Sequence, residues 1–109
     1  MKIVLRFRSV DKGIFDAVRA GKKKVETRAN TIRYKNATKG DILVCLCAGR
    51  KFQKVVRRVR RFKNPVGLLR AYTPTQILPG ATRAELLAVY NSFYKNGISN
   101  VGIVAFELE

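Results

Sequence analysis

Histidine is absent from the 109-residue chain, and acidic residues are scarce, with 7 Asp or Glu against 23 Lys or Arg. Without histidine, no side chain has an ordinary pKa near neutral pH for acid-base catalysis. Any catalysis would have to use Lys, Glu, Asp, Ser, Thr or Tyr. No apolar run approaches the roughly 18 residues of a membrane-spanning helix. The basic runs also lack the Trp, Phe and Leu face of an interfacial helix, so we expect no membrane partner.

Only two cysteines are present, and both lie in the most apolar segment, ILVCLCA at 42–48. In a strand, Cys45 and Cys47 share a face, and a disulfide between them would be strained. A zinc site lacks ligands, because there is no histidine and no second cysteine pair. We therefore expect two buried free thiols, no metal and no cofactor.

The net charge of +16 is unevenly distributed along the chain. Residues 1–70 hold 21 basic and 4 acidic side chains, whereas residues 71–109 hold 2 basic and 3 acidic ones. This asymmetry predicts a basic face that binds a polyanion, since each neutralised phosphate releases counterions. The alternative is a solubilising or heat-adapted surface, but such surfaces normally carry more glutamate than this chain has.

Apolar patterning predicts strands near 2–8, 24–28, 42–48, 51–62 and 101–109, with the third and fourth paired as a hairpin. A bulge within 51–62 would reconcile its two apolar parities. One helix is expected over about 12–20, followed by Gly21 in the left-handed conformation. A second helix should begin at Thr82, which forms a capping box with Glu85, and run to about Tyr94. Its expected core-facing residues are Leu86, Val89, Tyr90 and Phe93.

This order of elements favours one small α+β domain over residues 1–109, with helices outside a sheet that curls toward a barrel. No repeat, linker or low-complexity segment divides the chain.

The segment from Gly21 to Arg28 reads G-x-K-x-x-E-x-R and places two cations and a carboxylate within eight residues. In a strand, Lys24, Glu26 and Arg28 would project from one face, with Lys23 at the preceding turn. Glu26 could then hold one cation in a single rotamer while another contacts a phosphate or a base edge. The alternative is a solvated charge run beside the C-terminus of a helix.

With the Gly40-Asp41 turn, the helix over 82–94 and the closing GIVAFEL strand, this signature resembles the ASCH domain (activating signal cointegrator homology). The resemblance covers nearly the whole chain. It implies a barrel similar to the PUA fold and a cleft that binds RNA or other nucleic acid. Carried over by position, Lys23, Glu26 and Arg28 would line that cleft, and Gly21 would shape its turn.

Some small members of this family look like amidohydrolases that act on N4-acetylcytidine, and others look like ribonucleases. Their amidohydrolase lysine matches Lys23, and their later-helix glutamate matches Glu85. The position of their threonine is held here by Glu26, a poor substitute for a hydroxyl nucleophile. Thr27 is adjacent, but in a strand it would point to the opposite face. If the protein is an enzyme, Lys23, Glu26 and Glu85 are the catalytic candidates.

The densest basic segment is the arginine run, which we define as Arg57, Arg58, Arg60 and Arg61. In a strand these cations divide between two faces, and we expect them to contact phosphates and to extend the binding surface without reading sequence. The alternative is a solvated edge strand protected by charge. Among the tyrosines, Tyr34 in the basic loop is the best candidate for stacking on a base, although packing is the commoner role of such a residue.

The sequence therefore predicts a cytoplasmic domain that binds RNA, single-stranded or structured, with DNA as a second candidate. Catalysis of RNA or modified-nucleoside hydrolysis is the alternative function. A protein-interaction module is a third, which salt dependence would distinguish. The absence of an export signal in the sequence is the ground for the cytoplasmic expectation.

Overall fold

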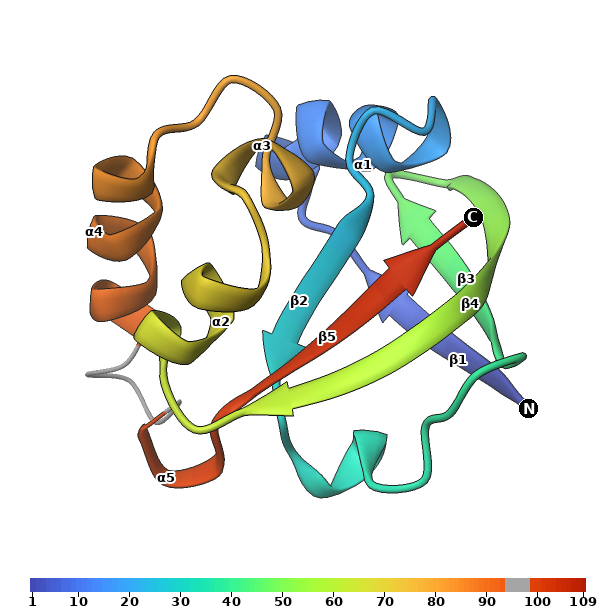
Figure 1. Cartoon of the computed structure of the whole chain (residues 1–109). Coiled ribbons are helices and arrows are strands. Elements are labelled where there is room, and N and C mark those ends of the chain that lie inside the picture. The colour runs from blue at the N-terminus through green and yellow to red at the C-terminus, as the bar shows by residue number, and fades with distance from the viewer. Residues whose placement is uncertain (94–98) are drawn as a thin grey trace.

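The computed structural model of the chain describes residues 1–93 and 99–109. Its centre is a mixed five-stranded sheet in the order β1-β3-β4-β5-β2 (Figure 1). β1 pairs with β3 in parallel, and every other neighbouring pair is antiparallel. The strands are β1 Lys2–Arg6, β2 Val25–Ala29, β3 Ile42–Cys47, β4 Arg50–Phe62 and β5 Ile103–Leu108.

The predicted closure of the sheet into a barrel is wrong. β1 and β2 are the two edges of the sheet, and no backbone pairing joins them among the described residues. Arginine side chains occupy the outer edge of β1 instead. Arg28 Nη1 donates to the carbonyl of Arg6 at 3.0 Å, and Arg33 donates to the carbonyl of Val4. Because these carbonyls are the groups that a further strand would use, the sheet is open at this edge.

β4 takes part in both halves of the sheet. Its first half pairs with β3 and its second half pairs with β5. A tight turn at Ala48 and Gly49, both with positive φ, joins β3 to β4 and confirms the predicted hairpin. A register shift between Val56 and Arg58 confirms the predicted bulge. The bulge determines which face of the sheet each later β4 side chain occupies.

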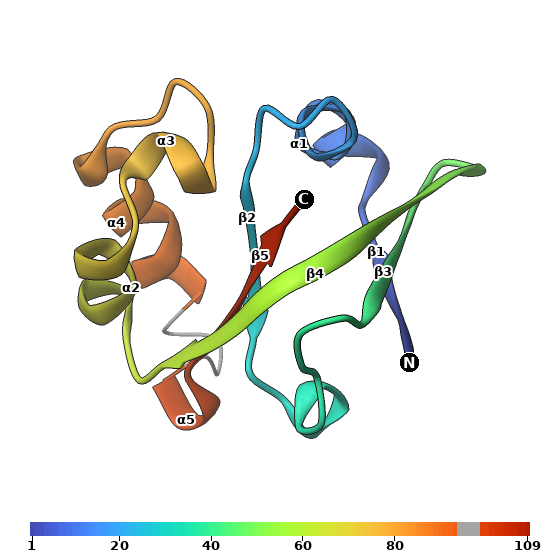
Figure 2. The same cartoon turned by 45° about the vertical axis from the view of Figure 1, so that its right-hand side comes forward.

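The helices lie on both sides of the sheet (Figure 2). α2 (Pro65–Ala71), α3 (Pro74–Ile77) and α4 (Arg83–Phe93) gather on one side, whereas α1 (Lys12–Arg19) lies against the other half of the molecule. Three short elements complete the described chain: the 3-10 helices η1 (Ser9–Asp11) and η2 (Ile32–Tyr34), and α5 (Ser99–Val101). No helix in the described ranges is long and apolar enough to cross a membrane.

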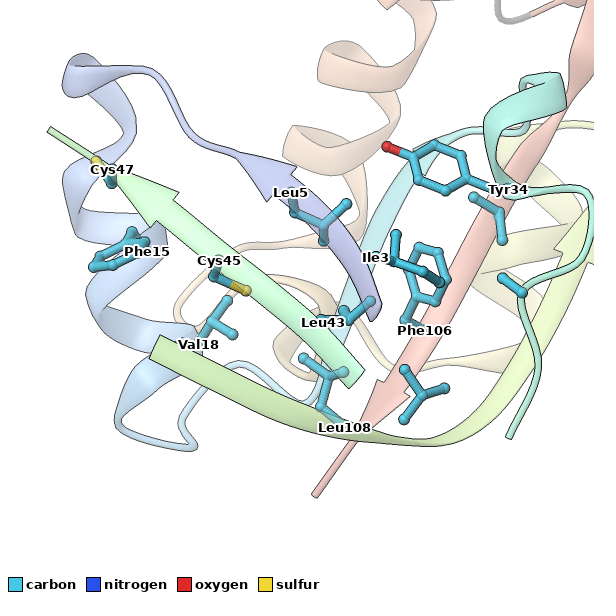
Figure 3. Close-up of a cluster of buried hydrophobic side chains, with 13 residues drawn as sticks. Ile3, Leu5, Phe15, Val18, Tyr34, Leu43, Cys45, Cys47, Phe106 and Leu108 are labelled. Carbon is cyan, nitrogen blue, oxygen red and sulfur yellow. The ribbon is translucent and has the colours of Figure 1, made fainter. Parts of the chain in front are cut away.

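Two hydrophobic clusters result from this layering. The inner face of β5, with Val104, Phe106 and Leu108, packs with β1, β3 and α1 (Figure 3). Its other face, with Ile103 and Ala105, packs against α2, α3 and α4. The two cysteines are buried free thiols, as expected. The alternation along β5 is the reason that the two clusters lie on opposite faces of one strand.

α4 begins with the predicted capping box. The Thr82 amide donates to Glu85 Oε1 at 3.0 Å, and the Glu85 amide donates to Thr82 Oγ1 at 3.2 Å. Leu86 and Tyr90 are buried, but Val89 and Phe93 are 46% and 49% exposed, so their predicted core positions are wrong. The helix buries only a narrow i, i+4 stripe against the sheet and α2. The predicted helix end at Tyr94 lies outside the described residues.

Candidate nucleic-acid interface

The turn after α1 determines where the lysines of the signature point. Gly21 has a φ of 78°, and its amide donates to Val18 O at 3.1 Å, while the Lys22 amide donates to Ala17 O at 3.0 Å. These two bonds form a Schellman motif, which confirms the predicted role of Gly21. The chain then enters β2 with Lys22 and Lys24 exposed and Lys23 buried.

Lys23 and Glu26 form a buried ion pair, which we call the buried pair. Lys23 Nζ lies 3.4 Å from Glu26 Oε1, and the two residues are 4% and 5% exposed. Lys23 Nζ also donates to Val25 O, and the Thr27 amide donates to Glu26 Oε1 at 3.0 Å. Glu26 Oε2 is buried and has no hydrogen-bond partner among the described residues. Glu26 therefore pairs with Lys23, which is one of the neighbouring cations that the sequence allowed it to hold.

Burial dominates the electrostatics of this region. It lowers the pKa of Lys23 below its usual range, although the carboxylate of Glu26 opposes that shift. Burial, with the nearby charge of Glu26, also raises the pKa of the Cys45 thiol to about 12. The buried pair thus belongs to the packed side of the sheet. In this arrangement neither side chain is open to a ligand at the surface.

The register of β2 on β5 separates the neighbouring side chains. Glu26 and Arg28 pair with Phe106 and Val104 on the inner face, whereas Thr27 pairs with Ala105 on the helix-covered face. Thr27 accordingly points away from Glu26, as predicted, and its hydroxyl lies 2.5 Å from Tyr90 OH. Burial raises the pKa of Tyr90 to about 12.

The side chain of Arg28 reaches from β2 across the inner face of the sheet to the edge strand β1. Its guanidinium lies 4.7 Å from the centre of the Phe7 ring, in addition to its bond to Arg6 O. Arg33 also binds the β1 edge: it donates to Val4 O, and its guanidinium lies 5.4 Å from the centre of the Tyr34 ring. The sequence reasoning missed Arg33; its position in the basic loop around Tyr34 was the available signal.

Glu85 does not join the buried pair. Its carboxylate is exposed and bonded within the capping box. α4 packs on the face of β2 opposite to the one that carries Glu26. The three catalytic candidates are therefore not brought together, and their catalytic role stays a prediction. Among the described residues, no three His, Cys, Asp or Glu side chains are arranged to hold a metal ion.

The arginine run divides between two faces, as the strand pattern predicts. Arg58 and Arg60 lie opposite Glu107 and Ala105 on the helix-covered face, and Arg61 lies opposite Val104 on the inner face. Arg58 Nη1 is 3.9 Å from Glu107 Oε2. Arg60 lies 5.1 Å and 5.6 Å from the ring centres of Phe62 and Tyr72. Phe62 lies two residues further along the same strand, whereas only the tertiary fold brings Tyr72 to Arg60.

Arg61 binds the loop that contains Tyr34 through hydrogen bonds to its carbonyl groups. Its Nη2 donates to the carbonyls of Tyr34, Ala37 and Lys35 at 2.7, 3.2 and 3.3 Å. Tyr34 is only 5% exposed, and its ring packs edge-on against Phe106 with centres 5.7 Å apart. The predicted stacking of Tyr34 on a base thus has no open ring face here, because the ring fills the core beneath the β1 edge.

Few of the surface cations have an internal counter-charge. The ion-paired carboxylates engage Arg8, Lys12, Lys23, Arg50, Arg58 and the amino group of Met1. Many exposed cations have no ion pair within the described part of the chain: Lys2, Arg6, Arg19, Lys22, Lys24, Lys35, Lys39, Lys51, Arg57, Lys63, Arg70 and Arg83. The positive charge predicted from the sequence is consequently at the surface and uncompensated.

Two solved structures have the same fold as this chain. Hypothetical protein PH0355 is 27% identical, with a TM-score of 0.83, and the match covers 100% of this chain and 98% of that one. Protein PF0455 from Pyrococcus furiosus is 24% identical, with a TM-score of 0.72 and coverage of 100% and 96%. No protein-family model matches the chain, and no curated protein matches it. The chain therefore shares its fold with these two proteins over nearly their whole length.

Proposed function

We propose that this protein is an ASCH-type domain that binds RNA through one part of its uncompensated surface charge, which includes Arg28 and Arg57. The observation that carries the proposal is the excess of exposed Lys and Arg over ion-paired carboxylates in the described chain. An RNA strand that neutralises such cations releases the counterions condensed on its phosphates, which drives binding. The G-x-K-x-x-E-x-R signature supports the assignment to the ASCH domain. A cytoplasmic location stays a prediction.

Within this proposal, the signature residues have two different roles. Lys23 and Glu26 neutralise each other and stabilise the start of β2. Arg28 reaches the open β1 edge, where its guanidinium lies over the Phe7 ring, and there it would contact a phosphate or a base. Arg57, at the bulge, and its neighbour Arg58 would contact the phosphate backbone.

We do not extend the proposal to hydrolysis. A hydrolase needs its nucleophile and its acid or base within reach of one substrate. Here Lys23 and Glu26 are 4% and 5% exposed, and Glu85 is bonded at the start of α4. Hydrolase activity remains a prediction from the family resemblance alone.

The test is equilibrium binding of fluorescently labelled 12-nucleotide RNA, in single-stranded and hairpin form, with single-stranded DNA of the same sequence beside it. Anisotropy is measured from 50 to 400 mM KCl. We expect binding at 50 mM that weakens linearly in log-log form, with a slope of about −0.7 per phosphate contact on a single strand. Absence of binding to every RNA at 50 mM KCl, or tighter binding to DNA than to RNA, would overturn the proposal.

Two matched double variants test the location. Arg57→Gln with Arg58→Gln removes two cations from the arginine run, and Lys12→Gln with Arg19→Gln removes two cations from α1. We expect the first variant to make the salt slope about 1.4 units less steep and the second to leave it nearly unchanged. Equal changes in both variants would show that binding follows net charge alone and not this surface.

A further inference from the structure

Two adjoining hollows lie where β2 and β4 end and β5 begins. The first, of about 540 Å³, is lined by Asn30, Arg61, Lys63, Asn64 and Asn100, among others. The second, of similar volume, contains Thr31, Ile32 and Lys35 and shares Asn30 and Arg61 with the first. Because they share two lining residues, the hollows adjoin, and we refer to them together as the depression. Arg28, Arg57 and Arg58 do not line the depression, whereas Arg61 of the arginine run does.

Close backbone packing forms the floor of this depression. The Asn30 amide donates to Gly102 O at 3.0 Å, which joins the end of β2 to the start of β5. Gly102 has a φ of 80°, and a Cβ there would lie 2.4 Å from Phe62 O at the end of β4. Arg61 is fixed by its three carbonyl partners. The pairing of the strands and the bonds of Arg61 therefore hold the floor of the depression.

The chemistry of the lining is positive, rich in amides and partly apolar. Lys35, Arg61 and Lys63 supply positive charge, and no carboxylate among the described residues lines either hollow. Asn64 Oδ1 already accepts from the Gly67 amide, which leaves its amide N–H groups for a ligand. Ile32 is 86% exposed at the rim.

Three asparagine side chains would be unusual partners for a bare phosphate, but they suit the mixed donors and acceptors of a sugar or a base edge. Cations beside them suit a phosphate. An exposed apolar side chain at the rim suits the face of a base. A ligand that combines all three chemistries is a phosphorylated nucleoside.

We propose that this depression binds a nucleoside monophosphate group, either as a free nucleotide or as the phosphorylated end of an RNA strand. Lys63 and Lys35 contact the phosphate, and Asn30 and Asn100 hydrogen-bond the sugar or base. Only the strand-end source rests on the proposed RNA-binding function.

The first experiment titrates the intact protein with AMP, CMP, GMP and UMP, carrying either a 5′- or a 3′-phosphate, and with adenosine and inorganic phosphate. Binding is followed by calorimetry. At least one nucleotide should bind about tenfold more tightly than adenosine or phosphate alone. Lys63→Gln and Asn30→Ala should each weaken that binding about tenfold, since a charge-assisted contact or a buried hydrogen bond is lost. Lys51→Gln, at the opposite end of β4, is the matched control and should have no effect.

The second experiment compares RNA octamers with 5′-phosphate, 3′-phosphate or hydroxyl ends. If the strand end is the ligand, one phosphorylated octamer binds about tenfold more tightly than the hydroxyl form, and Lys63→Gln removes the difference. If the free nucleotide is the ligand, the three octamers bind equally and the nucleotide still binds.

Two results would overturn the inference. Inorganic phosphate binding as tightly as every nucleotide would leave only an anion site. Equal weakening by Lys63→Gln and Lys51→Gln would place nucleotide binding elsewhere. Salt-sensitive RNA binding would survive either result, so the proposed function would stand. Conversely, Lys63-dependent nucleotide binding without any RNA binding would support this site and reject the proposed function.

Discussion

The buried pair and the arginine run are built from the same kinds of charge, but they lie in different environments. Lys23 is 4% exposed and held by a carboxylate 3.4 Å away, whereas Arg57 is exposed with no ion pair among the described residues. Arg61 is intermediate, since it lies in the run yet holds a loop through three carbonyls. A buried cation that is surrounded by acceptors therefore contributes to the stability of the fold, whereas an exposed cation without them is available to bind a partner.

The largest effect should come from removing charge from the buried pair. Glu26→Gln keeps the shape and an acceptor for the Thr27 amide, but it leaves the Lys23 cation buried without its carboxylate. We expect the free energy of unfolding to fall by about 3–5 kcal/mol in urea titrations. Asp11→Asn, which removes an exposed ion pair with Arg8, is the control and should cost less than about 1 kcal/mol. Equal losses in the two variants would contradict the comparison.

Alkaline pH should affect stability through the buried groups whose pKa values folding shifts, while the arginines stay charged. The folded protein holds the protons of Cys45, Tyr72 and Tyr90 up to about pH 12, whereas the unfolded chain releases them near 9.0 for the thiol and near 10.0 for the tyrosines. The folded state then binds more protons, so stability falls as pH rises, by up to about 1.4 kcal/mol per pH unit for each group.

Lys23 has the opposite effect over a lower range. Its pKa is lowered on folding, so the unfolded chain holds the extra proton and stability rises with pH until about 10.5. Between pH 10.5 and 12, only the loss of stability caused by the buried thiol and tyrosines should remain. Urea midpoints measured across this range check the sign, and Cys45→Ala should make the fall less steep. A flat profile in the native protein would show that these groups are not enclosed.

Arg61 and Arg57 should differ in stability although both belong to the arginine run. Arg61→Gln removes the bonds to Tyr34 O, Lys35 O and Ala37 O, and should lower the free energy of unfolding by about 1–3 kcal/mol. Arg57→Gln should change it by no more than about 0.5 kcal/mol. Thermal unfolding of the two variants side by side makes the measurement. Equal stability would assign both arginines to the surface.

The smallest expected effect concerns Arg60, which lies over the rings of Phe62 and Tyr72. Arg60→Lys keeps the charge but replaces the planar guanidinium with a compact ammonium. We expect a loss of about 0.5–1 kcal/mol in urea denaturation. Lys51→Arg, the reverse exchange at an exposed β4 position, should have no measurable effect. No loss at Arg60 would show that the rings do not fix its side chain.

Local features of the fold were predictable because short segments encode them. Gly21 ends α1 in a left-handed conformation, and Thr82 with Glu85 starts α4, since both motifs depend on residues within one helical turn. The β4 bulge followed from the change of apolar parity in its own sequence. In each case the decisive contacts lie close together along the chain.

Features that depend on distant partners were not predictable in the same way. The burial of Tyr34 requires Phe106, and the open edge requires Arg28 and Arg33 to reach β1. Val89 and Phe93 have apolar character and helical spacing, yet α4 has too narrow a contact to cover them. For the candidate site, the sequence identified Lys23, Glu26 and Arg28 as neighbours, but not which of them is enclosed.

The sequence by itself determined the sign and excess of charge, the absence of histidine chemistry and the order of strands and helices. Only the tertiary structure decided which cations are left for a partner. The desolvation of a charge depends on what packs around it, and that packing joins residues far apart in the chain. Lys23 lies between two exposed lysines of the same run, and the turn at Gly21 with the closure of β2 on β5 encloses it alone.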